Sequence, residues 1–257
     1  MSGSLRSGDV SRLRRLRRPR RGSVPKPQRP TVAEGWEAYA RRHRDREEVG
    51  DEWNQPEVIG LDVASPEEIL PYLDRVVFAP FLGTCDLLLE IGPGGGRFTE
   101  ILLPKCRRLI AVDTSQTMLE LLQQRFHGDE RLEYHLADGR GLGSVASASV
   151  DAAFSYGVFV HIQHWDIFNY LVELERVLKP GGQAIIQHSN TLSELGWELF
   201  TKQVERQLNR HKLPFTFTVN TPGLMREFVA RAGLECVDTL TEVARRDCIT
   251  LIRKPHA

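Results

Sequence analysis

The chain has 257 residues, of which 41% are hydrophobic, so it holds enough apolar material for one α/β domain with additions or for two small domains. Its formal net charge is +0, yet residues 1–30 alone carry ten basic residues against one acid. No apolar run approaches the roughly 20 residues that cross a bilayer, and residues 1–30 lack a hydrophobic signal segment. The composition therefore predicts neither a membrane-spanning nor a secreted protein.

Residues 1–30 are expected to form a disordered, arginine-rich tail, because prolines and few large apolar residues leave too little surface to bury. The simplest interpretation is a solvated extension or a mis-assigned start. Clustered cations also attract phosphate, so contact with nucleic acid or anionic lipid is a second interpretation. A mitochondrial transit peptide is a third, since the segment is rich in arginine and poor in acids.

The four cysteines are scattered and include no Cys-x-x-Cys pair, which disfavours a zinc site and a redox dithiol. This usage fits a reducing compartment. We therefore expect no metal site and a cytoplasmic protein, with a mitochondrial location as the alternative for a eukaryotic source.

Two helices are expected before the main fold. The first covers residues 34–48 and places Trp36 and Tyr39 on one side, since positions i and i+3 share a face. The second covers residues 65–76, SPEEILPYLDRV, and its start combines a capping box with a proline at the first helical position. We assign residues 31–80 to an N-terminal helical lid segment.

From residue 86 onward, short β-rich runs alternate with helical ones, which predicts parallel βαβ units and a doubly wound sheet. The expected strands are residues 86–92, 108–113, 131–138, 150–157 and 182–189, and the expected helices lie near 96–103, 115–126 and 166–178.

The C-terminal part reads as an insertion followed by a helix and two closing strands. A long helix over residues 191–211 is opened by a box from Thr191 to Glu194, and residues 214–219 alternate as a short strand or a lining segment. A helix is expected over residues 221–233, because Thr221 is a candidate N-cap, Pro222 lies in the first turn and Gly233 lies at the end. The two closing strands lie within residues 234–255 and join at a turn around Arg245.

The stretch LLLEIGPGGGRFTE, residues 87–100, combines a strand, a bare glycine turn and a helix, the geometry in which backbone N–H groups hold a polar ligand. A nicotinamide dehydrogenase is the obvious rival, but Arg97 occupies the third glycine position of its fingerprint. An acid at Glu90 would repel a pyrophosphate and attract an ammonium group. The nearest group of the ligand is therefore expected to be cationic. The glycines expected to let the backbone approach the ligand are Gly92, Gly94 and Gly96.

Four further motifs follow the glycine loop in order. They are Asp113 at the end of the second strand, LADG at 136–139, DAAFSYGVFVHI at 151–162 and LVELERVLKPGGQAII at 171–186. Together the five motifs resemble the class I S-adenosylmethionine-dependent methyltransferases, and TPGLMREFVARAGLECVD near the end is also similar to that family. The resemblance implies an α/β fold with a doubly wound, seven-stranded, mostly parallel, Rossmann-like sheet over residues 81–257. It also implies an enzyme that uses S-adenosyl-L-methionine.

The resemblance further implies roles for individual residues. Glu90 would hold the methionine ammonium, commonly through water, and Asp113 would accept hydrogen bonds from both ribose hydroxyls. Asp138 would accept from the adenine amino group, with a loop cap as its alternative, and Met118 would lie against the adenine, with a core position as its alternative. Arg97 would pair with the cofactor carboxylate or lie exposed on the helix. The remaining expected cofactor contacts are Gly92, Gly94, Gly96, Gly139 and Tyr156.

The fourth strand indicates which acceptor atom is methylated. Amino-directed family members usually carry Asn/Asp-Pro-Pro-Tyr/Phe there, whereas this chain has Ser-Tyr-Gly-Val at 155–158. Because the scattered cysteines do not support cytosine C5 chemistry either, we expect an oxygen nucleophile on a small-molecule acceptor, ahead of nitrogen or carbon. One alternative is an RNA or protein methyltransferase that uses the basic tail, and another is a cofactor-binding partner protein without turnover.

A histidine near the carboxyl edge of the sheet is a candidate base for a hydroxyl or phenol acceptor. His161 is the first candidate and His188 the second, although His161 would also serve as local packing. Aromatic side chains from the N-terminal segment and the late insertion are expected to form a lid that excludes water. They are Trp36, Tyr39, Trp53, Phe215 and Phe217.

Overall fold

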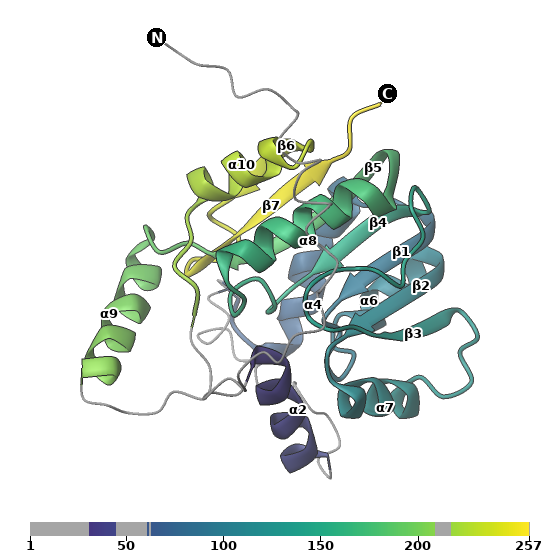
Figure 1. Cartoon of the computed structure of the whole chain (residues 1–257), viewed down its shortest axis with the longest axis horizontal. Helices are drawn as coiled ribbons and strands as arrows, with labels where there is room; N and C mark the ends of the chain where they lie inside the picture. The colour runs from purple at the N-terminus through teal and green to yellow at the C-terminus, as the bar shows by residue number, and fades with distance from the viewer. Residues whose placement is uncertain (1–30, 45–60, 62, 209–216, 257) are drawn as a thin grey trace, which may run out of the picture.

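The computed structural model describes residues 31–44, 61, 63–208 and 217–256 (Figure 1). The predicted tail at residues 1–30 lies outside the described residues, as do two of the expected lid aromatics, Trp53 and Phe215. No helix within the described ranges is both long enough and apolar enough to span a membrane.

Seven strands form one sheet in the order β3-β2-β1-β4-β5-β7-β6. Neighbouring strands run parallel from β3 to β5, while β7 runs antiparallel to both β5 and β6. This arrangement confirms the predicted doubly wound, mostly parallel sheet. The strands are β1 Cys85–Ile91, β2 Cys106–Asp113, β3 Leu132–Leu136, β4 Val150–Ser155, β5 Leu178–Ser189, β6 Glu235–Leu240 and β7 Asp247–Arg253.

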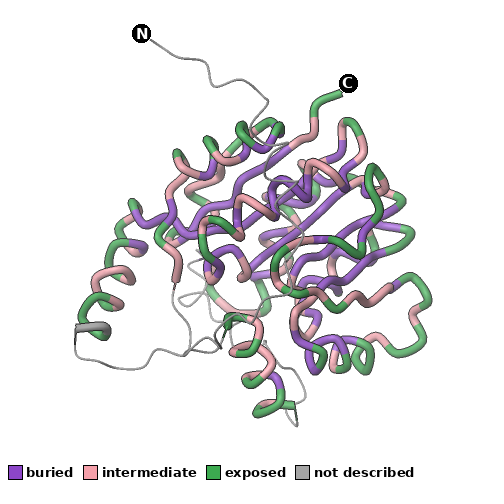
Figure 2. The backbone as a smooth tube through the Cα atoms, viewed as in Figure 1, coloured by how far each residue is buried: buried purple, intermediate pink, exposed green. Residues whose placement is uncertain are grey.

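Helices cover both faces of the sheet, so the apolar residues of the central strands are buried on both sides (Figures 1 and 2). The core of one face includes residues of α8 and α10, and the core of the other includes residues of α4 and α6. The helices are α2 Val32–His43, α4 Ile69–Leu73, α5 Ala79–Phe81, α6 Thr99–Leu102, α7 Gln116–Arg125, α8 His164–Val177, α9 Glu194–Leu208 and α10 Pro222–Arg231.

The strand before the glycine loop shows why this region folds as it does. Residues 87–91 are all buried, as expected for a parallel strand covered on both faces, and Glu90 is the one charged side chain among them. A carboxylate in that position costs free energy unless it is protonated or hydrogen-bonded, which marks the tip of β1 as a site with a function beyond packing.

The second N-terminal helix is less regular than predicted. The chain passes through a 3-10 turn at Pro66–Glu68, then α4, a π turn at Asp74–Phe78 and α5. The expected capping box does not form, because the side chain of Ser65 makes no capping hydrogen bond. Pro71 lacks an N–H group and crowds the preceding turn, so this run cannot remain an ideal α-helix.

The long helix after β5 begins later than predicted, at Glu194. Ser193 caps it, since its Oγ accepts a hydrogen bond from the Gly196 N–H at 3.0 Å. Thr191 instead accepts from the Asn220 N–H at 3.2 Å, so the predicted box at Thr191 is wrong. Of the two alternatives for residues 214–219, the short strand does not form over residues 217–219, and residues 214–216 lie outside the described ranges.

The closing elements match the prediction. Thr221 caps α10 by accepting from the Leu224 N–H at 3.1 Å, and β6 and β7 form an antiparallel pair. The β7 strand inserts between β5 and β6, which brings the turn before it to the carboxyl end of β5.

Candidate active site

A cavity of about 1410 Å³ opens at the carboxyl ends of β1, β2 and β4, beneath helix α2. The strand order reverses at β1 and β4, and open α/β sheets bind ligands at such a switch point. The volume exceeds the roughly 300–1,000 Å³ of a typical single-ligand pocket. The cavity therefore has room for two ligands side by side.

The glycine loop forms one wall of the cavity. Gly92 (φ +72°) and Gly94 (φ +56°) both line it, and a Cβ on Gly92 would run into the Val158 side chain. A Cβ on Gly94 would meet no atom within 4 Å, so it would project into open space. The loop thus presents bare backbone to a ligand, as predicted.

Gly96 has a different task from the other two glycines. Its φ is +93°, and an added Cβ would lie 2.6 Å from the side chains of both Leu122 and Phe126. Gly96 does not line the cavity. The structure therefore places this predicted cofactor contact in the packing between the loop and α7.

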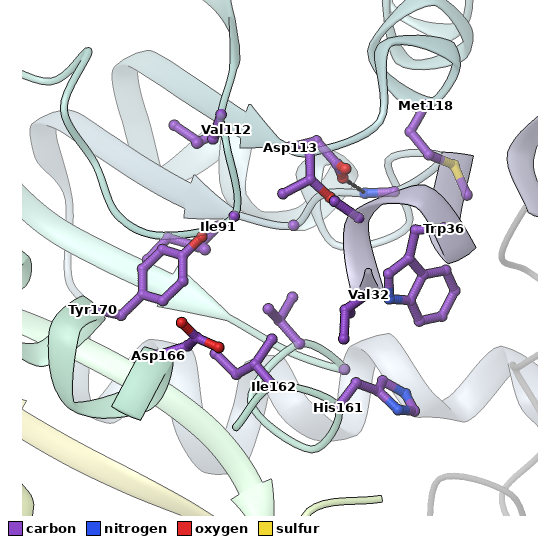
Figure 3. Close-up of a pocket in the computed structure, with 18 of the residues that line it drawn as sticks. Val32, Trp36, Ile91, Val112, Asp113, Met118, His161, Ile162, Asp166 and Tyr170 are labelled. Atoms are coloured by element: carbon purple, nitrogen blue, oxygen red, sulfur yellow. Dashed lines mark hydrogen bonds between the residues drawn. The ribbon is translucent and has the colours of Figure 1, made fainter. Parts of the chain in front are cut away.

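Asp113 lies at the end of β2 and lines the cavity (Figure 3). Its two carboxylate oxygens accept hydrogen bonds from the Ser115 N–H at 2.9 Å and the Gly94 N–H at 3.3 Å. Burial raises the pKa of Asp113 to about 6 in spite of these bonds. The carboxylate is therefore held in place, and it can still accept hydrogen bonds from hydroxyl groups of a ligand.

Glu90 lies next to the glycine loop but is not part of the cavity wall, and only 2% of it is exposed. Its Oε2 accepts a hydrogen bond from the Thr99 hydroxyl at 2.7 Å. Burial raises the pKa of Glu90 to about 7, and the neighbouring charge of Asp113 acts in the same direction. A ligand cation near the loop would favour the ionised form, which fits an ammonium group reached through an intervening water.

The end of the cavity near Asp113 contains three more of the predicted residues, Met118, Asp138 and Gly139. Met118 is 4% exposed, and Asp138 also acts as a loop cap by accepting from the Arg140 N–H at 2.8 Å. Met118 thus has the core position, and Asp138 the loop-cap role, that the sequence left open as alternatives. Both residues also line the cavity.

Two residues of α8 at this end were not found from the sequence. Asp166 and Tyr170 face the cavity opposite Asp113 (Figure 3). Burial raises the pKa of both side chains. The sequence signal available was their spacing of four on a helix that begins just after the fourth strand.

The other end of the cavity contains arginines and aromatic rings. The Arg97 guanidinium lies 4.5 Å from the Phe98 ring centroid and 5.9 Å from that of Tyr156, and all three line the cavity. The Tyr156 hydroxyl is buried and has no hydrogen-bond partner within the described part of the chain. Both Arg97 and Tyr156 therefore lie in the cavity wall, and their contact with the cofactor stays a prediction.

Gln187 and Arg246 complete this end and were missed by the sequence reasoning. The buried carboxylate of Asp247 accepts from Gln187 Nε2 at 2.7 Å and from Arg246 Nη2 at 2.6 Å. Phe217 also lines the wall, and the Arg246 guanidinium lies 5.1 Å from its ring centroid. The segment after β5 thus contributes to the pocket, as expected of the late insertion.

The two candidate bases have different locations. His161 lines the cavity, with its ring centroid 5.3 Å from that of Trp36 and 4.9 Å from that of Phe217. His188 does not line the cavity and is fully buried, with Nε2 2.8 Å from the Thr250 hydroxyl. Burial lowers the pKa of His188 to about 4. An enclosed imidazole cannot take a proton from an acceptor in the cavity, so the prediction of His188 as a base is wrong.

Helix α2 covers the cavity. Thr31, Val32, Ala33, Trp36 and Tyr39 all line it, and Figure 3 shows Val32 and Trp36 facing the same space as Asp113 and His161. The two predicted N-terminal lid aromatics within the described residues, Trp36 and Tyr39, therefore lie in the wall. Together, the bare loop, the two acids at adjacent strand ends and the covered cavity fit the nucleoside and amino-acid parts of S-adenosylmethionine.

Comparison with known proteins points the same way. Residues 89–186 match the family model described as a methyltransferase domain. The biotin biosynthesis bifunctional protein BioHC of Cellvibrio japonicus is 31% identical over 191 residues, covering 74% of this chain and 34% of the relative. The demethylmenaquinone methyltransferase of Clavibacter sepedonicus is 31% identical over 134 residues, covering 51% of this chain and 53% of the relative. The chain thus spans about a third to a half of the length of these relatives.

Solved structures share the fold. The [4+2]-cyclase SpnF superposes with a TM-score of 0.63 at 14% identity, covering 91% of this chain and 100% of that one. An S-adenosylmethionine-dependent methyltransferase of Methanosarcina mazei superposes with a TM-score of 0.56 at 15% identity, covering 71% and 98%. At these identities the likeness concerns the fold, and the match over residues 89–186 carries the assignment. Residues 89–186 belong to the methyltransferase-domain family, and the fold is that of the class I S-adenosylmethionine-dependent methyltransferases, whose methyl donor is S-adenosyl-L-methionine.

Proposed function

We propose that this protein transfers the methyl group of S-adenosylmethionine to an oxygen of a small-molecule acceptor. The observation that supports this most is one cavity of about 1410 Å³, beneath α2, whose wall includes Asp113, Asp138 and Asp166 as well as Arg97, Arg246 and several aromatic rings. Two ligands in one cavity are held close together, which favours an in-line displacement.

The cofactor would occupy the end near β2. In this proposal Asp113 accepts the ribose hydroxyls, Met118 and Asp138 contact the adenine, and the backbone of Gly92 and Gly94 adjoins the amino-acid part. Glu90 balances the ammonium charge from behind the loop, and Arg97 pairs with the carboxylate. The bound donor supplies an activated sulfonium methyl group, so the chain's own residues need only orient the acceptor, exclude water and manage one proton.

His161 would manage that proton. Its ring lines the cavity between two aromatic side chains, and an imidazole there can take a proton from a hydroxyl or phenol as the methyl group arrives. General-base catalysis of this kind contributes roughly 10²- to 10⁴-fold. Packing alone is the competing role, and a substitution that keeps a ring separates the two.

The N-terminal segment would act as the lid. Trp36 and Tyr39 of α2 and Phe217 of the segment after α9 close the cavity from different parts of the chain. We propose residues 31–80 as this lid segment and residues 81–257 as the catalytic domain, preceded by the basic residues 1–30.

The test is a product assay that does not presuppose the acceptor. The protein is incubated with deuterated methyl donor and a metabolite extract, and mass spectrometry searches for products carrying the labelled methyl group. Asp113→Ala is the matched control, because it should weaken cofactor binding and so reduce labelling at a donor concentration that limits the wild type. Labelled small molecules that form with wild type, and in smaller amounts with this variant, support the proposal; their absence with active cofactor binding contradicts it.

A macromolecular acceptor is the alternative with specific support. The ribosomal RNA small subunit methyltransferase A of Geobacter metallireducens is 42% identical over 66 residues, or 24% of this chain. The ten basic residues within positions 1–30 would supply affinity for RNA through counterion release. RNA binding with a steep salt dependence that disappears when residues 1–30 are removed would favour this alternative.

A protein that binds the cofactor without methyl transfer is the lesser alternative. The structural neighbour SpnF is titled a [4+2]-cyclase, which illustrates that one fold hosts different reactions. Cofactor binding without any labelled product, small or large, would select this alternative.

A further inference from the structure

We infer that Glu37 of α2 is a positioning residue that fastens the lid helix to the start of α7, and that this attachment holds the cofactor in the cavity. The inference rests on the proposed function, because it concerns how the covered cavity retains S-adenosylmethionine. It assigns a role to a side chain that contacts neither the cavity nor the reacting atoms.

Glu37 joins two helices that are far apart in sequence. Its Oε2 accepts hydrogen bonds from the Ser115 hydroxyl at 2.7 Å and the Thr117 N–H at 3.2 Å, and its Oε1 accepts from the Thr117 hydroxyl at 2.8 Å. The first N–H groups of a helix have no intrahelical partner and favour a negative charge. Glu37 therefore supplies from α2 a capping carboxylate for α7.

The Glu37 side chain is mostly buried at this contact, with 21% of it exposed. Burial alone would raise the pKa of Glu37, but hydrogen bonds from Ser115, Arg41 and Thr117 outweigh it and lower the pKa to about 2. The carboxylate is thus ionised at every pH at which the protein would be assayed. Arg41 lies on α2 itself, so its contact does not join the helices.

Ser115 connects this attachment to the cofactor site. The same residue donates its N–H to the Asp113 carboxylate at 2.9 Å, donates its hydroxyl to Glu37 and accepts from the Met118 N–H at 3.1 Å. The carboxylate expected to hold the ribose and the carboxylate that holds the lid therefore share one neighbour. Ordering of the segment from Asp113 to Met118 by a bound cofactor would also order the groups that donate hydrogen bonds to Glu37 of the lid.

The neighbouring face of α2 forms the cover itself. Val32 and Trp36 line the cavity (Figure 3). The buried Ala40 packs against Met118. A cofactor lying between α2 and the sheet cannot leave until α2 moves away from α7. Loss of the Glu37 hydrogen bonds should therefore speed release far more than it slows entry, because entry requires only an open lid.

The experiment measures S-adenosylmethionine dissociation by stopped flow in the full-length protein. Glu37→Ala should raise the dissociation rate roughly 10- to 100-fold, the effect expected from losing hydrogen bonds to a charged group. Thr117→Ala should raise it by a smaller factor and add little to Glu37→Ala, since both remove the same attachment. Arg41→Ala, which removes a partner of Glu37 without touching α7, should stay within about threefold of wild type.

Hydrogen exchange of residues 32–43 supplies a second readout that a merely stabilising residue would not change. Cofactor should slow exchange in this helix in wild type and have little effect in Glu37→Ala, while the unbound variant should lose no more stability than the removal of one helix cap costs. Wild-type release rates and wild-type protection in Glu37→Ala would overturn the inference. If wild type binds no cofactor, the proposed function fails, and exchange of α2 in the unbound Glu37→Ala protein still decides whether Glu37 fastens the helix.

Discussion

Trp36 of α2 and His161 of the segment after β4 pack edge to face, with ring centroids 5.3 Å apart. This contact joins the cover of the cavity to the candidate base. Phe217 packs on the same imidazole at 4.9 Å, so three separate parts of the chain meet at one ring. The orientation of His161 therefore depends on the lid being closed, and its replacement tests both chemistry and packing.

Two substitutions of His161 separate these roles. His161→Ala should lower kcat by roughly 10²-fold or more while changing cofactor affinity little, because a base acts only on the acceptor. His161→Phe keeps a ring between Trp36 and Phe217 but cannot accept a proton, so it should be equally slow. Steady-state kinetics with the identified acceptor measure this; recovery of wild-type rate in His161→Phe would leave packing as the role.

Asp113 should control cofactor affinity. Asp113→Ala removes the acceptor of the ribose hydroxyls, and calorimetry should record binding weakened by at least ~10-fold, given about 1.5–3 kcal/mol per hydrogen bond to a charged group. Since the pKa of Asp113 is about 6, wild-type affinity should fall as pH drops below that value, and Asp113→Asn should remove the part of this dependence that comes from Asp113 and leave the part that comes from Glu90. A wild-type affinity for Asp113→Ala would contradict the assignment.

Glu90 should make the unbound protein less stable as pH rises. Its pKa is about 7 in the folded state against an ordinary value of 4.5, so between these values the folded state holds a proton that the unfolded state has lost. The free energy of unfolding therefore decreases with rising pH in this range, by on the order of 3 kcal/mol from this group.

Urea unfolding between pH 4.5 and 7 measures the effect of Glu90. Glu90→Gln can keep the hydrogen bond from Thr99 and should flatten the decrease, whereas Glu227→Gln, at an exposed position on α10, should not. An unchanged slope in Glu90→Gln would mean that the buried carboxylate stays ionised.

The two loop glycines should fail in different ways. Both Gly94→Ala and Gly96→Ala force a side chain into positive φ, which costs roughly 1–2 kcal/mol. Gly96→Ala also crowds Leu122 and Phe126, so its free energy of unfolding should fall by at least about 1 kcal/mol more. Gly94→Ala should instead weaken cofactor binding. Equal urea stability of the two variants would show that α7 adjusts without cost.

Most of the sheet could be predicted from the sequence because its strands are short apolar runs between helical segments. The five predicted parallel strands and the closing pair all form. The elements that differ depend on details that pattern does not reveal. Proline makes the run after residue 65 irregular, and Ser193 rather than Thr191 offers its hydroxyl to the start of α9.

His188 shows why the site was harder to predict than the fold. Successive side chains on a strand point to opposite faces, so a location at the end of β5 leaves the orientation of each residue open. Gln187 lines the cavity, and His188 next to it is turned away and buried against Thr250. A difference of one residue thus decides between a site position and a core position.

Glu37 could not be found from the sequence either. In a helix rich in acids and bases, a glutamate that will contact a distant helix looks the same as one that faces solvent. Only the placement of α2 beside Ser115 and Thr117 distinguishes it.

The wall around Asp247 has a consequence for how such enzymes diversify. Gln187 on β5 and Arg246 before β7 are bridged by this one carboxylate, on elements separate from the loop and strand end that face the nucleoside. Substitutions in the closing hairpin, at the turn that carries Arg246, can therefore reshape what is accepted without altering Asp113 or the glycine loop. Phe217 differs, because it packs on His161 beside Trp36, so a change there would affect the acceptor and the lid together.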